Sequence, residues 1–86
     1  MPEISRFFGI IIAIFYNDHN PPHFHAKYGD YRTKISIDDL KIIEGSLPKR
    51  VLSLVLEWAF EHRTELMEDW QLALQKKALK PIKPLE

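Results

Sequence analysis

The chain has 86 residues with 12 basic and 12 acidic side chains, so its formal net charge is zero. A chain of this length forms one domain, residues 1–86, and its balanced charge excludes a protein drawn to nucleic acid or membrane by its overall field. Cysteine is absent, which excludes disulfides, thiolate catalysis and cysteine-ligated zinc.

The longest apolar run covers residues 7–16 and contains Gly9. A membrane-spanning helix needs about 20 apolar residues, so the run is too short to cross a bilayer. No signal-peptide cleavage pattern accompanies it. We therefore expect a cytoplasmic protein without membrane contact, in which electrostatic interactions come from local patches of charge.

The first half of the chain, residues 1–45, predicts an antiparallel sheet of three to four strands. Residues 7–16 are rich in β-branched and aromatic side chains and are apolar on both faces, which favours one central strand. Pro21 and Pro22 follow, and because proline interrupts strand pairing they indicate a loop.

A β-hairpin is predicted next, from the alternating residues 23–28 and 31–38. Gly29 and Asp30 lie between them, and glycine first in a two-residue loop suits a type II′ turn. The resulting register pairs Tyr28 with Tyr31, Ala26 with Thr33 and Phe24 with Ile35 on the core face. The opposite face then carries His23, His25, Lys27, Arg32, Lys34 and Ser36. A short further strand is expected at residues 40–44.

The second half, residues 46–78, predicts one long C-terminal amphipathic helix over about residues 47–77, so the fold class is α+β. Apolar side chains recur at helical spacing and form one stripe. Those side chains are Leu52, Val55, Leu56, Ala59, Leu66, Trp70 and Ala73. Pro81 stops the helix, and residues 79–86 are expected to form an extended tail with Ile82 and Leu85 as apolar anchors.

A straight helix of about 30 residues would be about 45 Å long. A compact domain of this size has a radius of gyration of only about 12 Å. The predicted helix therefore extends past the sheet, and residues 7–16 are apolar on both faces. Together these two features predict self-association or a stable complex with a protein partner.

His19, His23 and His25 form the candidate functional site. On a strand, His23 and His25 share a face and lie about 6.5–7 Å apart along the chain. His19 and Asp18 can reach the same position from the preceding loop. Neutral imidazoles bind metals, and imidazoles also exchange protons near pH 6.5. Three interpretations remain open: a metal site at His19, His23 and His25, acid–base catalysis by His23 and His25, and an ordinary surface hairpin.

Lys27, Arg32 and Lys34 lie beside His23 and His25 on the predicted hairpin face. Cations of this kind contact phosphate groups. Two histidines with three cations suit a phosphodiester, with the imidazoles as acid and base and the cations on the developing charge. This basic histidine face is therefore a candidate RNA-binding or RNA-cleaving surface, and a solvated hairpin face is the alternative.

His62 falls within the apolar stripe of the predicted helix, with Glu65 and Asp69 after it. A functional interpretation places His62 across from the sheet histidines, with a carboxylate orienting its ring. The simpler interpretation is a half-buried histidine with a satisfied ring. We favour the simpler one, because the helix is expected to cover the sheet face opposite His23 and His25.

Several segments also resemble a known family. They are residues 1–10, the string Asp-His-Asn-Pro-Pro-His-Phe-His at 18–25, residues 57–66 around Trp58 and His62, Trp70, and residues 82–85. Over essentially its whole length the chain resembles domain-of-unknown-function family 4160, a set of short bacterial proteins. The resemblance marks His19, His23 and His25 as the family signature but assigns them no role.

Members of that family are often encoded beside another small protein, in an arrangement like a toxin–antitoxin pair. The resemblance therefore implies a component of a two-gene bacterial module with a small protein partner encoded alongside it. Combined with the basic histidine face, it leads us to expect RNA binding or cleavage. The alternative is a non-enzymatic metal-binding or protein-interaction module, with a divalent transition metal as cofactor.

Overall fold

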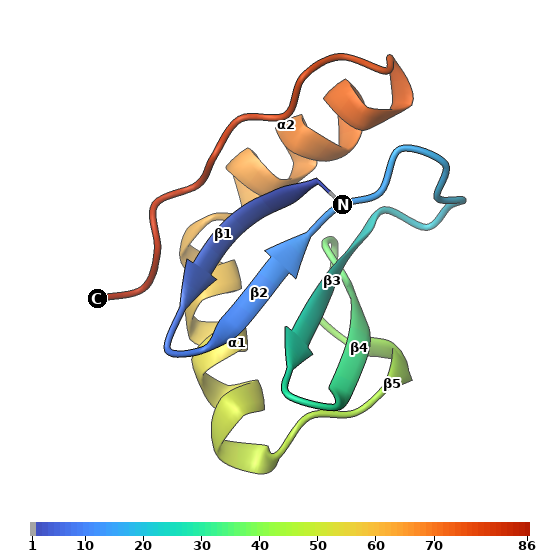
Figure 1. Ribbon diagram of the computed structural model, residues 1–86. Helices are drawn as coiled ribbons and strands as arrows, with labels where there is room; N and C mark the ends of the chain where they lie inside the picture. Colours follow the sequence, from blue (N-terminus) through green and yellow to red (C-terminus); the bar gives the residue numbers. More distant parts are fainter. Residues whose placement is uncertain (1) are drawn as a thin grey trace.

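A computed structural model of the protein describes residues 2–86. An antiparallel sheet comes first and two helices follow it (Figure 1). The strands are β1 (Glu3–Phe7), β2 (Ile10–Ala13), β3 (His23–Tyr28), β4 (Tyr31–Ser36) and β5 (Ile42–Gly45), and the helices are α1 (Lys49–Glu61) and α2 (Arg63–Leu74). Strands that follow one another in the chain are neighbours in the sheet. The predicted α+β class is confirmed.

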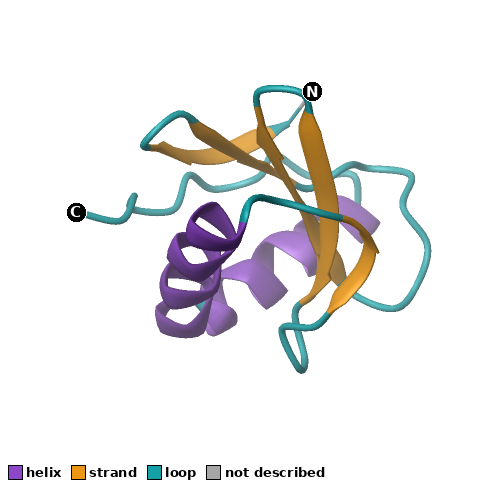
Figure 2. Ribbon diagram, turned by 90° about the horizontal axis from the view of Figure 1, so that it is seen from below, coloured by secondary structure: helices purple, strands orange, loops and turns teal. Residues whose placement is uncertain are grey.

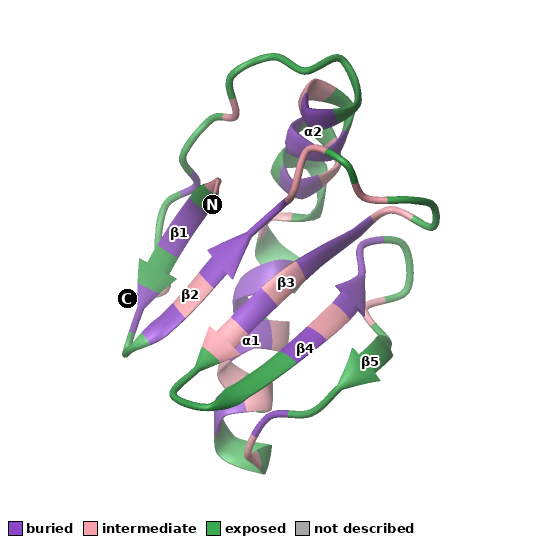
Figure 3. Ribbon diagram, turned by 45° about the vertical axis from the view of Figure 1, so that its right-hand side comes forward, coloured by how far each residue is buried: buried purple, intermediate pink, exposed green. Residues whose placement is uncertain are grey.

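The two helices cover one face of the sheet and leave the other face open (Figure 2). The core lies between these layers, and burial is greatest on β2 and on the inner parts of β3 and β4 (Figure 3). Its largest fully buried side chains include Trp58 and Trp70 from the helices and Phe24, Ile12 and Ile35 from the sheet. β5 is exposed along its whole length.

The prediction of one strand over residues 7–16 is wrong, because a hairpin turn divides the run. Phe7 pairs with Ile10, and the two residues between them, Phe8 and Gly9, have φ angles of 50° and 78°. Two consecutive positive φ angles match the twist of a two-residue hairpin turn. The sheet therefore has five strands rather than three to four. β2 lies inside the sheet, between β1 and β3, and its Ile11 and Ala13 line a cleft on the open face.

The register predicted for the second hairpin is confirmed. Tyr28 pairs with Tyr31, Ala26 with Thr33 and Phe24 with Ile35. Gly29 has a φ of 57°, as the first position of a type II′ turn requires. The two tyrosines are not core residues, however. They close the hairpin at the end of the sheet, where Tyr28 is 36% and Tyr31 is 49% exposed.

The last strand is predicted at residues 40–44, but β5 begins at Ile42 and ends at Gly45. Leu40 has a φ of 55° and belongs to the turn before β5. At the other end, Gly45 has a φ of 79° and lies so close to β4 that an added Cβ would be 2.1 Å from the carbonyl oxygen of Arg32. Only glycine fits this approach without moving the backbone.

The single helix predicted over residues 47–77 is also wrong, because the chain breaks at His62. His62 has φ −121° and ψ 24°, and its N–H donates to the carbonyl of Ala59. The break allows both helices to lie over a domain whose longest extent is 34 Å. Leu66 and Trp70 of α2 are buried as a result. The helix does not extend past the sheet, so that argument for self-association is removed, and self-association itself stays a prediction.

No helix within residues 2–86 combines the length and the apolar character needed to cross a membrane.

The tail after α2 runs back over the core beside β1. Ile82 is buried and its N–H donates to the carbonyl of Ile4 over 2.7 Å. The indole N–H of Trp58 donates to the carbonyl of Lys83. Asp69 is 1% exposed, and its Oδ1 accepts the backbone N–H of Lys80 over 2.8 Å. These contacts fix the extended segment to both layers of the fold.

Asp69 should make stability depend on pH. Burial raises the pKa of Asp69, and its second oxygen has no hydrogen-bond partner. A carboxyl whose pKa is raised by folding stabilises the fold while it is protonated, and that contribution is lost as pH rises through the folded-state pKa. An asparagine side chain at this position would keep an acceptor for Lys80 without titrating. We therefore expect Asp69→Asn to gain stability relative to wild type as pH rises from about 4 to neutrality.

Urea unfolding of both proteins across that pH range measures the difference. Glu61→Gln, at an exposed helical site, is the control for removing one negative charge. A stability difference that stays constant with pH, or one that shrinks as pH rises, would contradict the role given to Asp69.

Candidate metal centre

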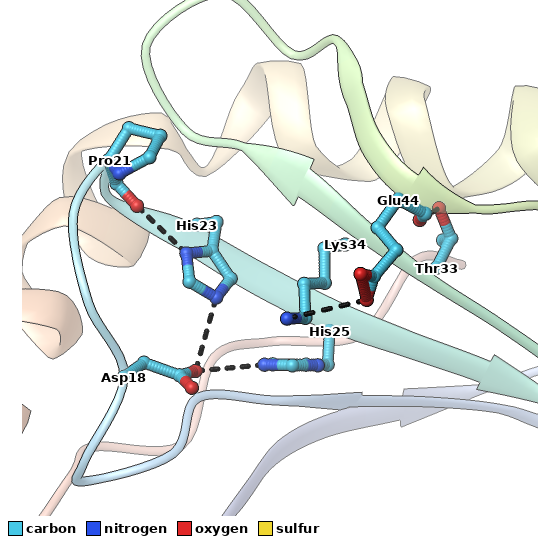
Figure 4. A network of polar contacts seen from close by, with 7 residues as sticks. All are labelled: Asp18, Pro21, His23, His25, Thr33, Lys34 and Glu44. Atoms are coloured by element: carbon cyan, nitrogen blue, oxygen red, sulfur yellow. Dashed lines mark hydrogen bonds and ion pairs between the residues drawn. The ribbon is translucent and has the colours of Figure 1, made fainter.

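Three side chains from the loop before β3 and from β3 itself converge at one point: Asp18, His23 and His25 (Figure 4). His23 and His25 are two residues apart on a strand, so both side chains leave the same face. Asp18 reaches them from the loop between β2 and β3. One potential ligand atom of each residue lies within 4.8 Å of the other two.

The hydrogen bond of His23 determines which ring nitrogen faces this cluster. Nδ1 of His23 lies 2.8 Å from the carbonyl oxygen of Pro21. A carbonyl only accepts, so Nδ1 carries a proton and donates it. In the neutral ring, Nε2 then has a lone pair. That atom is buried without a hydrogen-bond partner and lies 3.2 Å from Oδ2 of Asp18. A lone pair therefore faces a carboxylate oxygen unless a proton or a metal ion lies between them.

The same carboxylate oxygen contacts the second ring. Nε2 of His25 lies 2.8 Å from Oδ2 of Asp18. Burial lowers the pKa of His25, although Asp18 acts in the opposite direction, and the nearby charges of His23 and Lys34 lower it further. A lowered pKa keeps the imidazole of His25 neutral at physiological pH, which is the form that binds metals.

Aromatic neighbours fix the two rings in place. His23 is 5% exposed, and its ring centroid lies 5.2 Å from that of Trp70. His25 lies edge-on to Phe15, with ring centroids 4.4 Å apart. The expectation that the helix avoids the histidine face is therefore wrong for His23, because Trp70 of α2 packs against it. Rings held by packing on one side and by a hydrogen bond on the other are preorganised for ligation.

His19, the third predicted metal ligand, is exposed and is not one of the clustered residues. Of the two loop residues that were candidates for the place beside His23 and His25, Asp18 occupies it and His19 does not. His62 is also separate from the cluster: its Nδ1 lies 2.6 Å from Oε1 of Glu65, and its ring packs against Trp58. His62 therefore has the half-buried, satisfied environment that the sequence favoured.

Lys27, Arg32 and Lys34 lie on the open sheet face with His25. Lys27 is paired directly with Arg32, and His25 with Lys34. Lys34 forms an ion pair with Glu44 at 3.4 Å. Lys27 and Arg32 border a cleft of about 260 Å³ whose other walls include Phe15, Ile11 and His25. The structure thus brings the predicted phosphate contacts and His25 onto one surface.

Fold and site together define a small α+β domain with a carboxylate–histidine cluster at one end of its sheet. Comparison with known families identifies it further. The sequence model of the family described as Domain of unknown function (DUF4160) matches residues 9–71, a segment that contains the whole cluster and both helices up to Gln71. The chain belongs to this family. Neither the curated proteins nor the solved structures contain a match.

Proposed function

We propose that the protein binds one divalent transition metal ion through Asp18, His23 and His25. The observation that carries this proposal is the buried Nε2 of His23, which has no hydrogen-bond partner and faces the carboxylate of Asp18 at 3.2 Å. A metal ion placed between these atoms would neutralise the carboxylate and use the nitrogen lone pair. It would also replace the proton that His25 shares with Asp18.

The spacing of the three atoms is compatible with a single ion. Ligand atoms bound tetrahedrally about 2.0–2.1 Å from zinc lie about 3.4 Å from one another. The separations of 3.2 Å and 2.8 Å from Oδ2 of Asp18 to the two ring nitrogens require only small movements to reach that value. One ligand atom from each of the three residues lies within 4.8 Å of the other two. A set of two imidazoles and one carboxylate favours Zn²⁺, Ni²⁺ or Co²⁺ over Mg²⁺ and Ca²⁺, which prefer oxygen ligands.

The bound ion would link the loop before β3 to the strand, and its first role would be to fix that loop. Three protein ligands leave a further coordination position. A small protein partner encoded alongside would be able to supply a side chain to it. We therefore propose a metal-dependent interaction module, and the toxin–antitoxin-like arrangement stays a prediction about its partner.

RNA cleavage by His23 and His25 as an acid–base pair receives less support. His23 is 5% exposed and hydrogen-bonded through Nδ1, so a substrate outside the protein has little access to it. A general acid or base must come within hydrogen-bonding reach of the proton that it transfers. The arrangement suits ligation better than proton transfer to an external substrate.

Calorimetric titration of the untagged protein with Zn²⁺ tests the metal proposal. We expect one binding event per chain, with full affinity above about pH 7. Because ligating imidazoles must be neutral, affinity should fall as pH drops through about 6.5. The lowered pKa of His25 places proton competition at that ring at a lower pH than for an ordinary histidine.

The result that contradicts this proposal is equally specific. Heat changes no larger than those of an Asp18→Asn variant, with affinity no tighter than about millimolar, would leave the cluster as a structural ion pair between Asp18 and a protonated His23.

A further inference from the structure

The end of the sheet that holds both hairpin turns combines exposed aromatic rings with cations. The β1–β2 and β3–β4 turns lie side by side at this end (Figure 1), where Gly9 comes close to the ring of Tyr28. Phe8 is 61% exposed, Tyr31 49% and Tyr28 36%. Lys27 on β3 and Arg32 on β4 are next to the two tyrosines, one position farther from the turn. We call Phe8, Lys27, Tyr28, Tyr31 and Arg32 the hairpin end.

The two cations of the hairpin end form no ion pair with an acidic side chain, although Asp30 lies in the turn between them. Lys27 and Arg32 are directly opposite each other in the β3–β4 ladder, and like charges in that arrangement destabilise a sheet. Neither has an ion-pair partner among the residues that the structure describes, whereas Lys34 on the same face is paired with Glu44. A like-charge pair that forms no ion pair, on the rim of an open cleft, is suited to bind an anion.

The aromatic rings form a second feature on the other side of the same tip. A groove of about 400 Å³ is lined by Phe8, Tyr28, Arg50 and the apolar residues Ile10, Val51 and Leu54. Phe8 occupies a left-handed position, with a φ of 50°, that a bulky residue rarely adopts. Its ring lies edge-on to that of buried Phe7, and most of its surface is open to contact with a ligand.

We propose that the hairpin end binds single-stranded nucleic acid, with Lys27 and Arg32 on phosphate groups and a base in the groove of Phe8 and Tyr28. Proteins that bind single strands combine cations that follow the backbone with aromatic rings on which bases stack. A strand that passes over the end of the sheet reaches both features. The five residues of the hairpin end are distinct from the three residues of the metal cluster, although His25 also lines the cleft that Lys27 and Arg32 border.

Fluorescence anisotropy with a labelled oligouridine of about ten nucleotides, a length within the range of about 4–16 nucleotides that a single OB fold binds, tests the proposal. We expect saturable binding by wild type at low salt. Lys27→Gln/Arg32→Gln should lower the magnitude of the salt slope by about 1.4, since each phosphate contact on a single strand contributes about 0.7. The thermal stability of that variant should equal or exceed that of wild type, because a like-charge pair has been removed.

A matched variant controls for net charge. Lys76→Gln/Lys77→Gln removes two exposed lysines beyond α2 and should keep the wild-type slope. Lys27→Gln alone should lower the slope by about 0.7 and serves if the double variant does not fold. Phe8→Asn keeps a residue that tolerates a positive φ, and its affinity should fall about fivefold to a hundredfold through lost stacking.

Several results would overturn the proposal. Wild-type protein that shows no saturable binding, or a control variant that loses as much affinity as Lys27→Gln/Arg32→Gln, would remove the site. If inorganic phosphate competes as well as unlabelled oligouridine at the same mass concentration, the hairpin end is a phosphate site and not a nucleic-acid site. An equal loss of oligonucleotide affinity in Asp18→Asn would place the contact at the metal cluster instead.

Discussion

Replacing His23 with alanine is expected to weaken Zn²⁺ binding more than about a hundredfold, because even residues that only orient metal ligands cost about 10- to 100-fold when replaced. His23 supplies the one buried nitrogen of the cluster without a hydrogen-bond partner. His25→Ala should have a similar effect, and since the His25 side chain is 22% exposed its removal leaves less of a cavity. Calorimetry on both variants, with circular dichroism to verify folding, makes the measurement.

His19→Ala is the matched control. His19 belongs to the same segment but is exposed and outside the cluster, so this variant should bind Zn²⁺ like wild type. A loss in His19→Ala as large as that in His23→Ala would contradict the ligand set of Asp18, His23 and His25 and would favour His19, His23 and His25 instead.

Trp58→Ala is expected to cost about 3–5 kcal/mol of stability. Trp58 is fully buried, packs against Phe7 and Phe24, and donates its indole N–H to the tail at Lys83. A domain of this size has about 4–13 kcal/mol in total. The variant should therefore lose a large fraction of its stability, and the tail should become more sensitive to proteolysis.

Phe60→Ala, in the same helix but 69% exposed, is the comparison and should change stability by no more than about 0.5 kcal/mol. Urea unfolding of the two variants separates them. Similar midpoints for Trp58→Ala and Phe60→Ala would contradict the packing described for α1.

Local turn chemistry made the second hairpin predictable. Gly29 and Asp30 form a two-residue turn between alternating segments, and together these fix which residues face each other, since a slip of one position would turn every side chain to the wrong face. His23 and His25 could be placed on one face for the same reason. The turn at Phe8 and Gly9 is not predictable in this way, because it lies within an apolar run and only Gly9 is a typical turn residue.

Tertiary packing decided the features that the sequence did not predict. The helical periodicity continues through His62, so no local signal ends α1 there; the break lets α2 cover the sheet and allows the ring of His62 to contact Trp58 and Glu65. The choice of Asp18 over His19 depends on how the loop before β3 turns, which no periodicity describes. The burial of His23 depends on Trp70, about 50 residues away in the chain.

Native mass spectrometry of the untagged protein, stripped with a chelator and then supplied with one equivalent of Zn²⁺, tests the central claim most directly. We predict a mass increase of one zinc ion per chain at neutral pH for wild type, and none for His23→Ala. Wild-type protein that remains metal-free under these conditions, or that retains zinc equally well as His23→Ala, would contradict the assignment of Asp18, His23 and His25 as a metal centre.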